Sequence, residues 1–223
     1  MILCNKLPSC NQAFIGRKDE IKAIASHLSN QSVLFITGMA GIGKSEVAKA
    51  YAQKNRKKYT NIIYLYYTGD LRKDIANLTF ADDSVEMNEE VRFQNHYKVM
   101  QRLHTDTLLI LDNFNVLPKD EPFLKELMKN DMQLLITSRC KLKNYDSIEI
   151  KELDKEKELT ELFYKHCPSA KRDPDSVSAI IEEVNCHTLT VCMAALTLEA
   201  SGMEPDNDYS KSTARYLYSL YMR

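Results

Sequence analysis

Short apolar runs alternate with amphipathic stretches over the first two thirds of the chain. Five runs rich in aliphatic and aromatic residues predict strands, at residues 33–37, 62–67, 107–111, 133–137 and 147–150. Most segments between them are helical or irregular, and apolar residues recur at helical spacing over residues 17–28, 44–57 and 88–104. Because strands joined by such crossovers pair in parallel, the pattern predicts an α/β fold with a five-stranded parallel sheet and flanking helices.

The pattern changes after Leu153, where no further strand is evident. Helical spacing follows at residues 154–166, 174–184 and 189–200, and again from 208 to 223. We therefore expect a lead-in at 1–13, the α/β domain at 14–153 and a small all-helical subdomain at 154–207. At 208–223 we expect the start of a further helical or winged-helix element that the chain cuts short.

Charge and composition limit the classes of partner and site that the chain is expected to have. Thirty basic and thirty-one acidic residues leave a formal net charge of -1, so no global field favours nucleic acid or a membrane surface. No stretch reaches the ~18 to 20 apolar residues that cross a bilayer, and the start of the chain has no signal-peptide pattern. The six cysteines form no CxxC pair, which argues against a zinc site and a disulfide framework. We expect a cytoplasmic protein without a membrane partner.

One motif carries specific chemistry. The residues Gly38-Met39-Ala40-Gly41-Ile42-Gly43-Lys44-Ser45 match GxxxxGK[ST] in full and lie between a predicted strand and a predicted helix. Glycines let backbone N–H groups turn inward around an anion, the lysine reaches the β- and γ-phosphates, and the serine hydroxyl binds Mg²⁺. A glycine turn that precedes a lysine by chance is disfavoured, because three of the chain's six glycines fall in register here. The motif predicts a P-loop domain that binds ATP or ADP with Mg²⁺, with nucleotide-binding positions extending through Glu46.

Two strand ends complete the predicted site. Asp112 ends the apolar run 108–111 and is predicted to hold Mg²⁺, although an aspartate at a strand end also commonly caps a turn. Asn113 follows where many P-loop ATPases place a second acid, and because an amide is a poor base we expect slow or negligible ATP hydrolysis. Arg139 follows the apolar run 134–136 and is expected beside the γ-phosphate. A solvated arginine in a surface loop explains its spacing equally well.

Together these motifs resemble the NB-ARC-type core of the STAND family of signalling P-loop NTPases. The resemblance covers residues 14–202 and rests, in order, on Phe14-Ile15-Gly16-Arg17, GMAGIGKS, LLILDN, LLITSR and Cys186-His187-Thr188-Leu189. It implies that Ile15, Gly16 and Arg17 lie by the adenine, and that the helices after Leu153 form an ARC-like lid.

The same resemblance implies a function. It assigns catalytic contacts to Lys44, Asp112 and Arg139, and the Mg²⁺ site to Ser45 and Asp112. The implied protein is an ATP/ADP switch in signal transduction that self-associates through its nucleotide-binding core in the full-length protein.

The sequence departs from that family at two points. The lid turn His187-Thr188-Leu189 lacks the Gly-x-Pro whose proline contacts nucleotide in the family, and many relatives carry two acids where this chain has Asp112-Asn113. Two other functions therefore stay open. One is an AAA+-like ATPase acting on nucleic acid or protein, which would be expected to have an acidic pair at that strand end. The other is a structural scaffold with permanently bound nucleotide.

Two further features are interpreted as structural. The cations Arg56-Lys57-Lys58 at the end of a predicted helix are typical of a solvated terminus, so nucleic acid is not an expected partner. The cluster of Tyr64, Tyr66 and Tyr67 is interpreted as residues that alternate along a sheet strand.

Overall fold

The computed structural model describes residues 7–84, 86–140, 142–202, 205 and 208–221, which form two compact units. Unit 1 comprises the residues up to Cys10 together with Lys18–Gly38 and Lys44–Glu149. Unit 2 comprises Asn11–Arg17, Met39–Gly43 and the chain from Ile150 onward. In the described part of the chain, no helix is long and apolar enough to cross a membrane.

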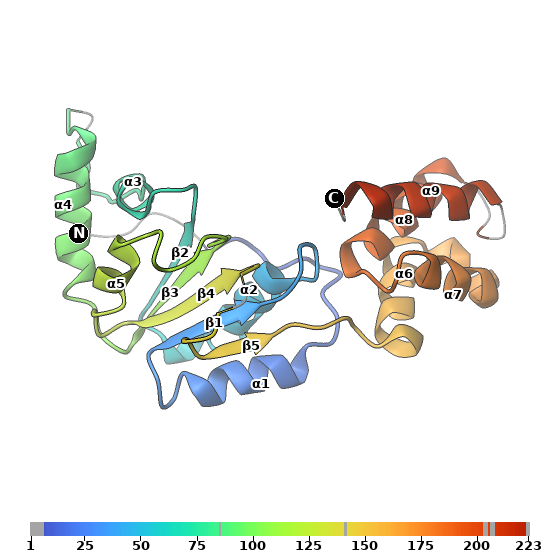
Figure 1. The fold of residues 1–223 in the computed structure, drawn as a ribbon, viewed down its shortest axis with the longest axis horizontal. Helices are drawn as coiled ribbons and strands as arrows, with labels where there is room; N and C mark the ends of the chain where they lie inside the picture. Colours follow the sequence, from blue (N-terminus) through green and yellow to red (C-terminus); the bar gives the residue numbers. More distant parts are fainter. Residues whose placement is uncertain (1–6, 85, 141, 203–204, 206–207, 222–223) are drawn as a thin grey trace. The chain divides into compact units, whose positions relative to one another are not determined.

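Unit 1 is built on a fully parallel sheet with the strand order β2-β3-β4-β1-β5 (Figure 1). The strands are β1 (Val33–Thr37), β2 (Asn61–Tyr66), β3 (Thr107–Asp112), β4 (Gln133–Ser138) and β5 (Ser147–Glu149). The five predicted strands are thus confirmed, with each end within one residue of its expected place. Because parallel strands share one carboxyl edge, β1, β3 and β4 all end at the edge where such sheets bind ligands.

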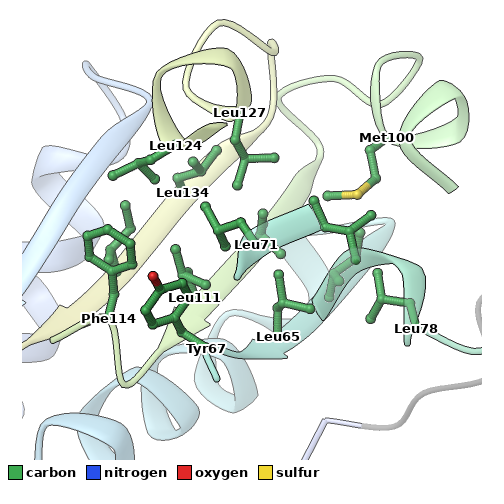
Figure 2. Packing of buried hydrophobic residues seen from close by; sticks show 14 of the residues in the cluster. Leu65, Tyr67, Leu71, Leu78, Met100, Leu111, Phe114, Leu124, Leu127 and Leu134 are labelled. Atoms are coloured by element: carbon green, nitrogen blue, oxygen red, sulfur yellow. The ribbon is translucent and has the colours of Figure 1, made fainter. Parts of the chain in front are cut away.

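On one face of this sheet, a hydrophobic core joins the strands to three helices: α3 (Leu71–Ala76), α4 (Glu89–Met100) and α5 (Phe123–Leu127). Alternate strand residues supply the contact, because successive side chains of a strand point to opposite faces. Figure 2 shows Leu65, Leu111 and Leu134 facing this layer, which contributes Leu71, Met100, Leu124 and Leu127. Figure 1 shows the three helices grouped on one side of the sheet and α1 on the other.

Two of these helices are absent from the sequence-based expectation. Helices α3 and α5 have six and five residues, too few for a 3.6-residue period to stand out. Helix α3 is fixed locally instead, because the Asp70 side chain accepts hydrogen bonds from the N–H groups of Arg72 and Lys73 at 2.9 and 3.1 Å. The predicted helix at 88–104 is confirmed as α4, capped by Asn88, but it ends at Met100.

The opposite face carries the other set of alternate residues, among them Leu34, Ile36, Ile110 and Leu135. Helix α2 (Lys44–Lys54) contacts β1, β3 and β4, and α1 (Lys18–His27) contacts α2 and β5. The predicted helix at 44–57 ends earlier than expected, at Lys54, and a 3-10 turn at Arg56–Lys58 (η1) follows. Asn55 marks this end, since its side-chain amide donates to the carbonyl of Tyr51 at 2.9 Å.

Unit 2 is helical. It contains a π-helical turn at Lys155–Leu159 (η2), α6 (Thr160–His166), a 3-10 turn at Pro168–Arg172 (η3), α7 (Pro174–Glu183), α8 (Thr188–Ser201) and α9 (Asp208–Tyr221). Its core includes Phe163 of α6, Ile181 of α7, Ala195 of α8 and Ala214 of α9, all fully buried. Helix α9 contacts α7 and α8, so it belongs to the same compact unit as the three predicted helices before it.

Candidate nucleotide-binding site

The base of the glycine-rich loop lies in unit 1, where β1 leads to Gly38 and α2 begins at Lys44. The Lys44 ammonium is largely buried and donates a hydrogen bond to the carbonyl of Gly38 at 2.9 Å. Burial, and next the positive charge of Arg139, lower the pKa of Lys44 to about 8, while the charge of Asp112 acts in the opposite direction. Both effects disfavour the charged form of Lys44, and an anion bound beside its ammonium would restore that form.

Asp112 forms the centre of a hydroxyl network at the carboxyl edge of the sheet. Its Oδ1 accepts hydrogen bonds from Ser45 Oγ at 2.7 Å and from Thr137 Oγ1 at 2.5 Å. Its Oδ2 accepts from the hydroxyl of Tyr64. Burial, and next the hydrogen bond to Asp112, raise the pKa of Tyr64, so the phenol stays a donor. The structure therefore brings Ser45 and Asp112 together, as the sequence predicted. A hydroxyl beside a carboxylate is an all-oxygen donor set of the kind that suits Mg²⁺.

Asn113 is held in a fixed conformation immediately after Asp112. Its φ of 65° lies in the left-handed region, which asparagine tolerates better than most residues. Its backbone N–H donates to Thr137 Oγ1 at 2.9 Å, and its side-chain amide donates to the carbonyl of Tyr67 at 3.3 Å. Its side-chain oxygen accepts from Asn115 Nδ2 at 2.5 Å. The residue next to Asp112 is thus engaged in holding strand ends together.

Arg139 is exposed and follows β4 directly. Its backbone N–H donates to the side-chain oxygen of Asn115 at 2.9 Å, which ties the end of β4 to the loop after β3. The positive charge of Arg139 also contributes to the lowered pKa of Lys44. Glu46, which the sequence adds to the nucleotide-binding set, pairs with Lys49 on α2 at 2.5 Å.

The tip of the loop, Met39–Gly43, belongs to unit 2, and its carbonyl groups are anchored there. His187 Nε2 lies 2.7 Å from the carbonyl oxygen of Ala40, and Arg17 Nη2 donates to the carbonyl of Ile42 at 3.2 Å. Because a carbonyl oxygen can only accept, Nε2 carries the proton that faces Ala40, and the other ring nitrogen, Nδ1, lies 2.7 Å from the hydroxyl of Thr190. In an anion-binding loop the N–H groups face the ligand. Donors on the carbonyls of Ala40 and Ile42 therefore help to fix the loop's peptide planes.

Gly41 lies against the same anchor. Its φ is 70°, and a Cβ there would lie 2.7 Å from His187 Cε1 and 2.8 Å from Leu189 Cβ. Both the backbone conformation and the close approach of these side chains require glycine. Gly43, by contrast, has a φ of 105° and open space around its Cα, so only its backbone conformation requires glycine.

The three residues expected beside the adenine, Ile15, Gly16 and Arg17, lie in unit 2. Ile15 packs against the apolar core of unit 2, and Gly16 lies against the Glu158 side chain, so close that a Cβ would overlap it. Arg17 is buried and directs one guanidinium nitrogen at the phosphate loop, as described above. The hydrogen bonds of Arg17 and His187 to the loop were not expected from the sequence, because no spacing rule links residues 25 and 147 positions away from their partners.

Comparison with known proteins shows which family this chain belongs to. The family described as the AAA domain matches residues 26–144, which is more than half of the chain. Among curated proteins, no sequence matches this chain.

Solved structures show the same fold at low sequence identity. A Walker-type ATPase of Pyrococcus abyssi matches with a TM-score of 0.65 and 10% identity, over 96% of this chain and 73% of that one. Domain III of the replication initiation protein DnaA from Thermotoga maritima matches with a TM-score of 0.57 and 15% identity, over 97% and 100%. A STAND protein with a tetratricopeptide repeat sensor from Pyrococcus horikoshii matches with a TM-score of 0.49 and 17% identity, over 83% and 30%. The last score is too low to support an argument, and the first two show a shared fold. With its complete P-loop, its parallel strand order and this family match, the chain belongs to the AAA domain family of P-loop ATPases.

Proposed function

We propose that this chain is an Mg²⁺-dependent ATP/ADP switch of the STAND type, in which lasting occupancy by nucleotide, and not rapid turnover, carries the signal. The observation that carries the proposal is the residue after Asp112. Asn113 has no proton-accepting group of useful basicity, and its side chain is already bonded to Tyr67 and Asn115. A water molecule beside the γ-phosphate would therefore lack the acid that activates it in many P-loop ATPases.

Nucleotide binding follows from the chemistry of the loop base. The ammonium of Lys44 is partly desolvated and close to a second cation, so a polyphosphate would restore its favoured charged state. Ser45 and Asp112 are placed to hold Mg²⁺ beside those phosphates. We expect adenine nucleotides to be preferred, because no NKxD-type guanine-binding motif follows the phosphate elements.

The NB-ARC-type assignment, narrower than the AAA domain family, gives residues 154–207 the role of a lid. Two contacts within unit 2 support it, since His187, which precedes α8, and Arg17, which precedes α1, both donate to carbonyls of the loop tip. Any change in the loop's backbone on nucleotide binding would alter these two hydrogen bonds, and a bound nucleotide would thereby bias the state of the helices. Signalling, self-association through the core and a cytoplasmic location are part of the same proposal.

The decisive experiment combines nucleotide content, exchange and turnover on the purified chain. Nucleotide released by denaturation is identified, exchange is followed with a fluorescent ADP analogue, and phosphate release is measured with Mg²⁺ and ATP. The proposal expects bound ADP or ATP that exchanges, with phosphate release far below the ~10 s⁻¹ typical of enzymes. Lys44→Ala should abolish binding, and the exposed Lys54→Ala is the matched control on the same helix.

Each competing function has its own outcome in that experiment. The AAA domain match favours an ATPase that acts on nucleic acid or protein, and several turnovers per second, lost in Lys44→Ala, would establish it in place of the switch. Tightly bound nucleotide that never exchanges would indicate a structural scaffold. Light scattering with ADP and with an ATP analogue tests self-association, which the switch expects to differ between the two nucleotides.

A further inference from the structure

Tyr64 makes a contact that the P-loop motif does not account for. Its hydroxyl donates a hydrogen bond to Oδ2 of Asp112, whereas Ser45 and Thr137 donate to Oδ1. Tyr64 is half-buried, lies near Glu46 as well, and comes from β2, a strand that supplies no other residue to the predicted site.

The register of the sheet explains how the tyrosine reaches the carboxylate. In the parallel pair of β2 and β3, Tyr64 is opposite Ile110 and Tyr66 is opposite Asp112, so both tyrosines share a face with Asp112. Tyr64 is thus a diagonal neighbour of Asp112, two positions back, at a separation that a long aromatic side chain can span. Tyr66, directly opposite, is 54% exposed.

The effect of the hydrogen bond from Tyr64 depends on how many acceptor sites of the Asp112 carboxylate are already occupied. An ionised aspartate offers about four lone-pair sites on its two oxygens. Ser45 and Thr137 donate to Oδ1, and Tyr64 donates to Oδ2. One acceptor direction therefore remains, on Oδ2 next to the tyrosine hydroxyl, for a water molecule of a bound Mg²⁺.

We propose that Tyr64 is a positioning residue for Mg²⁺, which fixes the Asp112 carboxylate so that its one remaining acceptor direction meets the metal's water shell. The inference rests on the proposed Mg²⁺-dependent nucleotide binding and assigns a further residue to it. Without the tyrosine hydroxyl, the carboxylate keeps its two donors on Oδ1, but the orientation of Oδ2 is no longer specified. Hydrogen-bonding partners of metal-binding groups typically contribute about 10- to 100-fold to metal affinity.

The test uses Tyr64→Phe, which removes the hydroxyl and keeps the ring. Binding of a fluorescent ADP analogue is measured on the full chain in EDTA and in excess Mg²⁺, and the ratio of the two Kd values gives the benefit from Mg²⁺. We expect Tyr64→Phe to reduce this ratio about tenfold. The Kd in EDTA should stay within about twofold of the unmodified chain, because the phosphate loop is untouched. Tyr66→Phe, on the same strand and face, should change neither value.

The outcomes separate this inference from the proposed function. If the unmodified chain binds no nucleotide, the proposed function fails. If it binds, and Tyr64→Phe retains the full benefit from Mg²⁺, the positioning role is wrong. An equal loss of affinity in EDTA and in Mg²⁺ would also overturn it, since the tyrosine would then support the fold and not the metal. An unmodified chain that binds nucleotide equally well with and without Mg²⁺ would contradict the positioning role too, because Asp112 would then hold no metal.

Discussion

Lys44 provides the sharpest test of the site, because its pKa makes nucleotide binding depend on pH. Burial and the nearby charge of Arg139 lower the pKa of Lys44 from its ordinary value of 10.5 to about 8 in the nucleotide-free chain. A bound polyphosphate favours the charged lysine and raises that pKa again. Binding near pH 8 must therefore take up protons, and affinity must fall as the pH rises through 8.

The size of the effect follows from the titration of this one group. At a pKa of about 8, half of the free chains carry a neutral Lys44 at pH 8, so binding should take up roughly half a proton per nucleotide there. Between pH 7 and pH 9 the charged fraction drops roughly tenfold, and nucleotide affinity should weaken by the same factor. An unperturbed lysine would give almost no change over this range, since its pKa of 10.5 leaves it charged throughout.

Calorimetry measures both quantities. Titration with ADP at pH 8 in two buffers of different ionisation enthalpy gives the proton uptake, and Kd at pH 7, 8 and 9 gives the affinity. EDTA is present throughout, so that no metal charge alters the titration of Lys44. Lys54→Ala should retain the full pH dependence. Affinity that is flat from pH 7 to pH 9, without proton uptake, would refute the reasoning that connects burial of Lys44 to its charge.

Four further changes test separate parts of the chain. Arg139→Ala should weaken ATP binding about tenfold and leave ADP within about twofold, measured by competition, if its guanidinium meets only the γ-phosphate. Asn113→Asp should raise phosphate release by up to about 10²-fold, because it adds a base beside Asp112. His187→Ala should weaken nucleotide binding by about fivefold, since the Ala40 carbonyl loses one hydrogen bond. Asp83→Asn should lower the free energy of unfolding in urea by about 1 to 3 kcal/mol, because Asp83 accepts from the buried His96 at 2.8 Å. Burial opposes ionisation of Asp83, but hydrogen bonds from His96 and the Phe80 N–H hold its pKa below the ordinary value of 3.8. The stability that the ionised Asp83 contributes is therefore complete above about pH 3.8 and is lost as the pH falls through its lowered pKa.

The parts of the site that could be predicted are those whose geometry is local. A strand, three glycines in register, a lysine and a serine determine a P-loop within eight residues, and the structure places Gly38 and Lys44 as that motif requires. Strands β1 to β4 were predictable for a related reason, since each contains an unbroken apolar run, whereas β5 alternates polar and apolar residues from Ser147 to Ile150. Asp112 was identified because it ends an apolar run, and the structure places its carboxylate 2.7 Å from the hydroxyl of Ser45.

The parts that could not be predicted depend on register between strands and on packing between distant segments. Tyr64 was interpreted as one of three tyrosines that alternate along a strand, and the structure places it in β2 on the same face as Asp112. Its contact with Asp112 follows only from the offset between β2 and β3, which no pattern in either strand specifies. The hydrogen bonds from Arg17 and His187 depend in the same way on where the loop carbonyls lie, and sequence periodicity does not predict those positions.

The acidic side chains near the carboxyl edge of the sheet bear on the choice between a slow switch and a rapid ATPase. Asp74 accepts hydrogen bonds from the N–H and hydroxyl of Thr68, at 2.9 and 2.5 Å. Glu121 accepts from the Tyr67 hydroxyl and the Leu71 N–H, each at 3.2 Å. Both carboxylates are buried and hold the loops that follow the strands. Removing a proton from water would require one of them to abandon these donors, at about 1 to 3 kcal/mol for each buried group left unpaired. With Asp112 engaged by three hydroxyls and Asn113 unable to accept the proton, none of these four side chains is placed to activate water readily, and the edge therefore favours the proposed long-lived nucleotide state over rapid turnover.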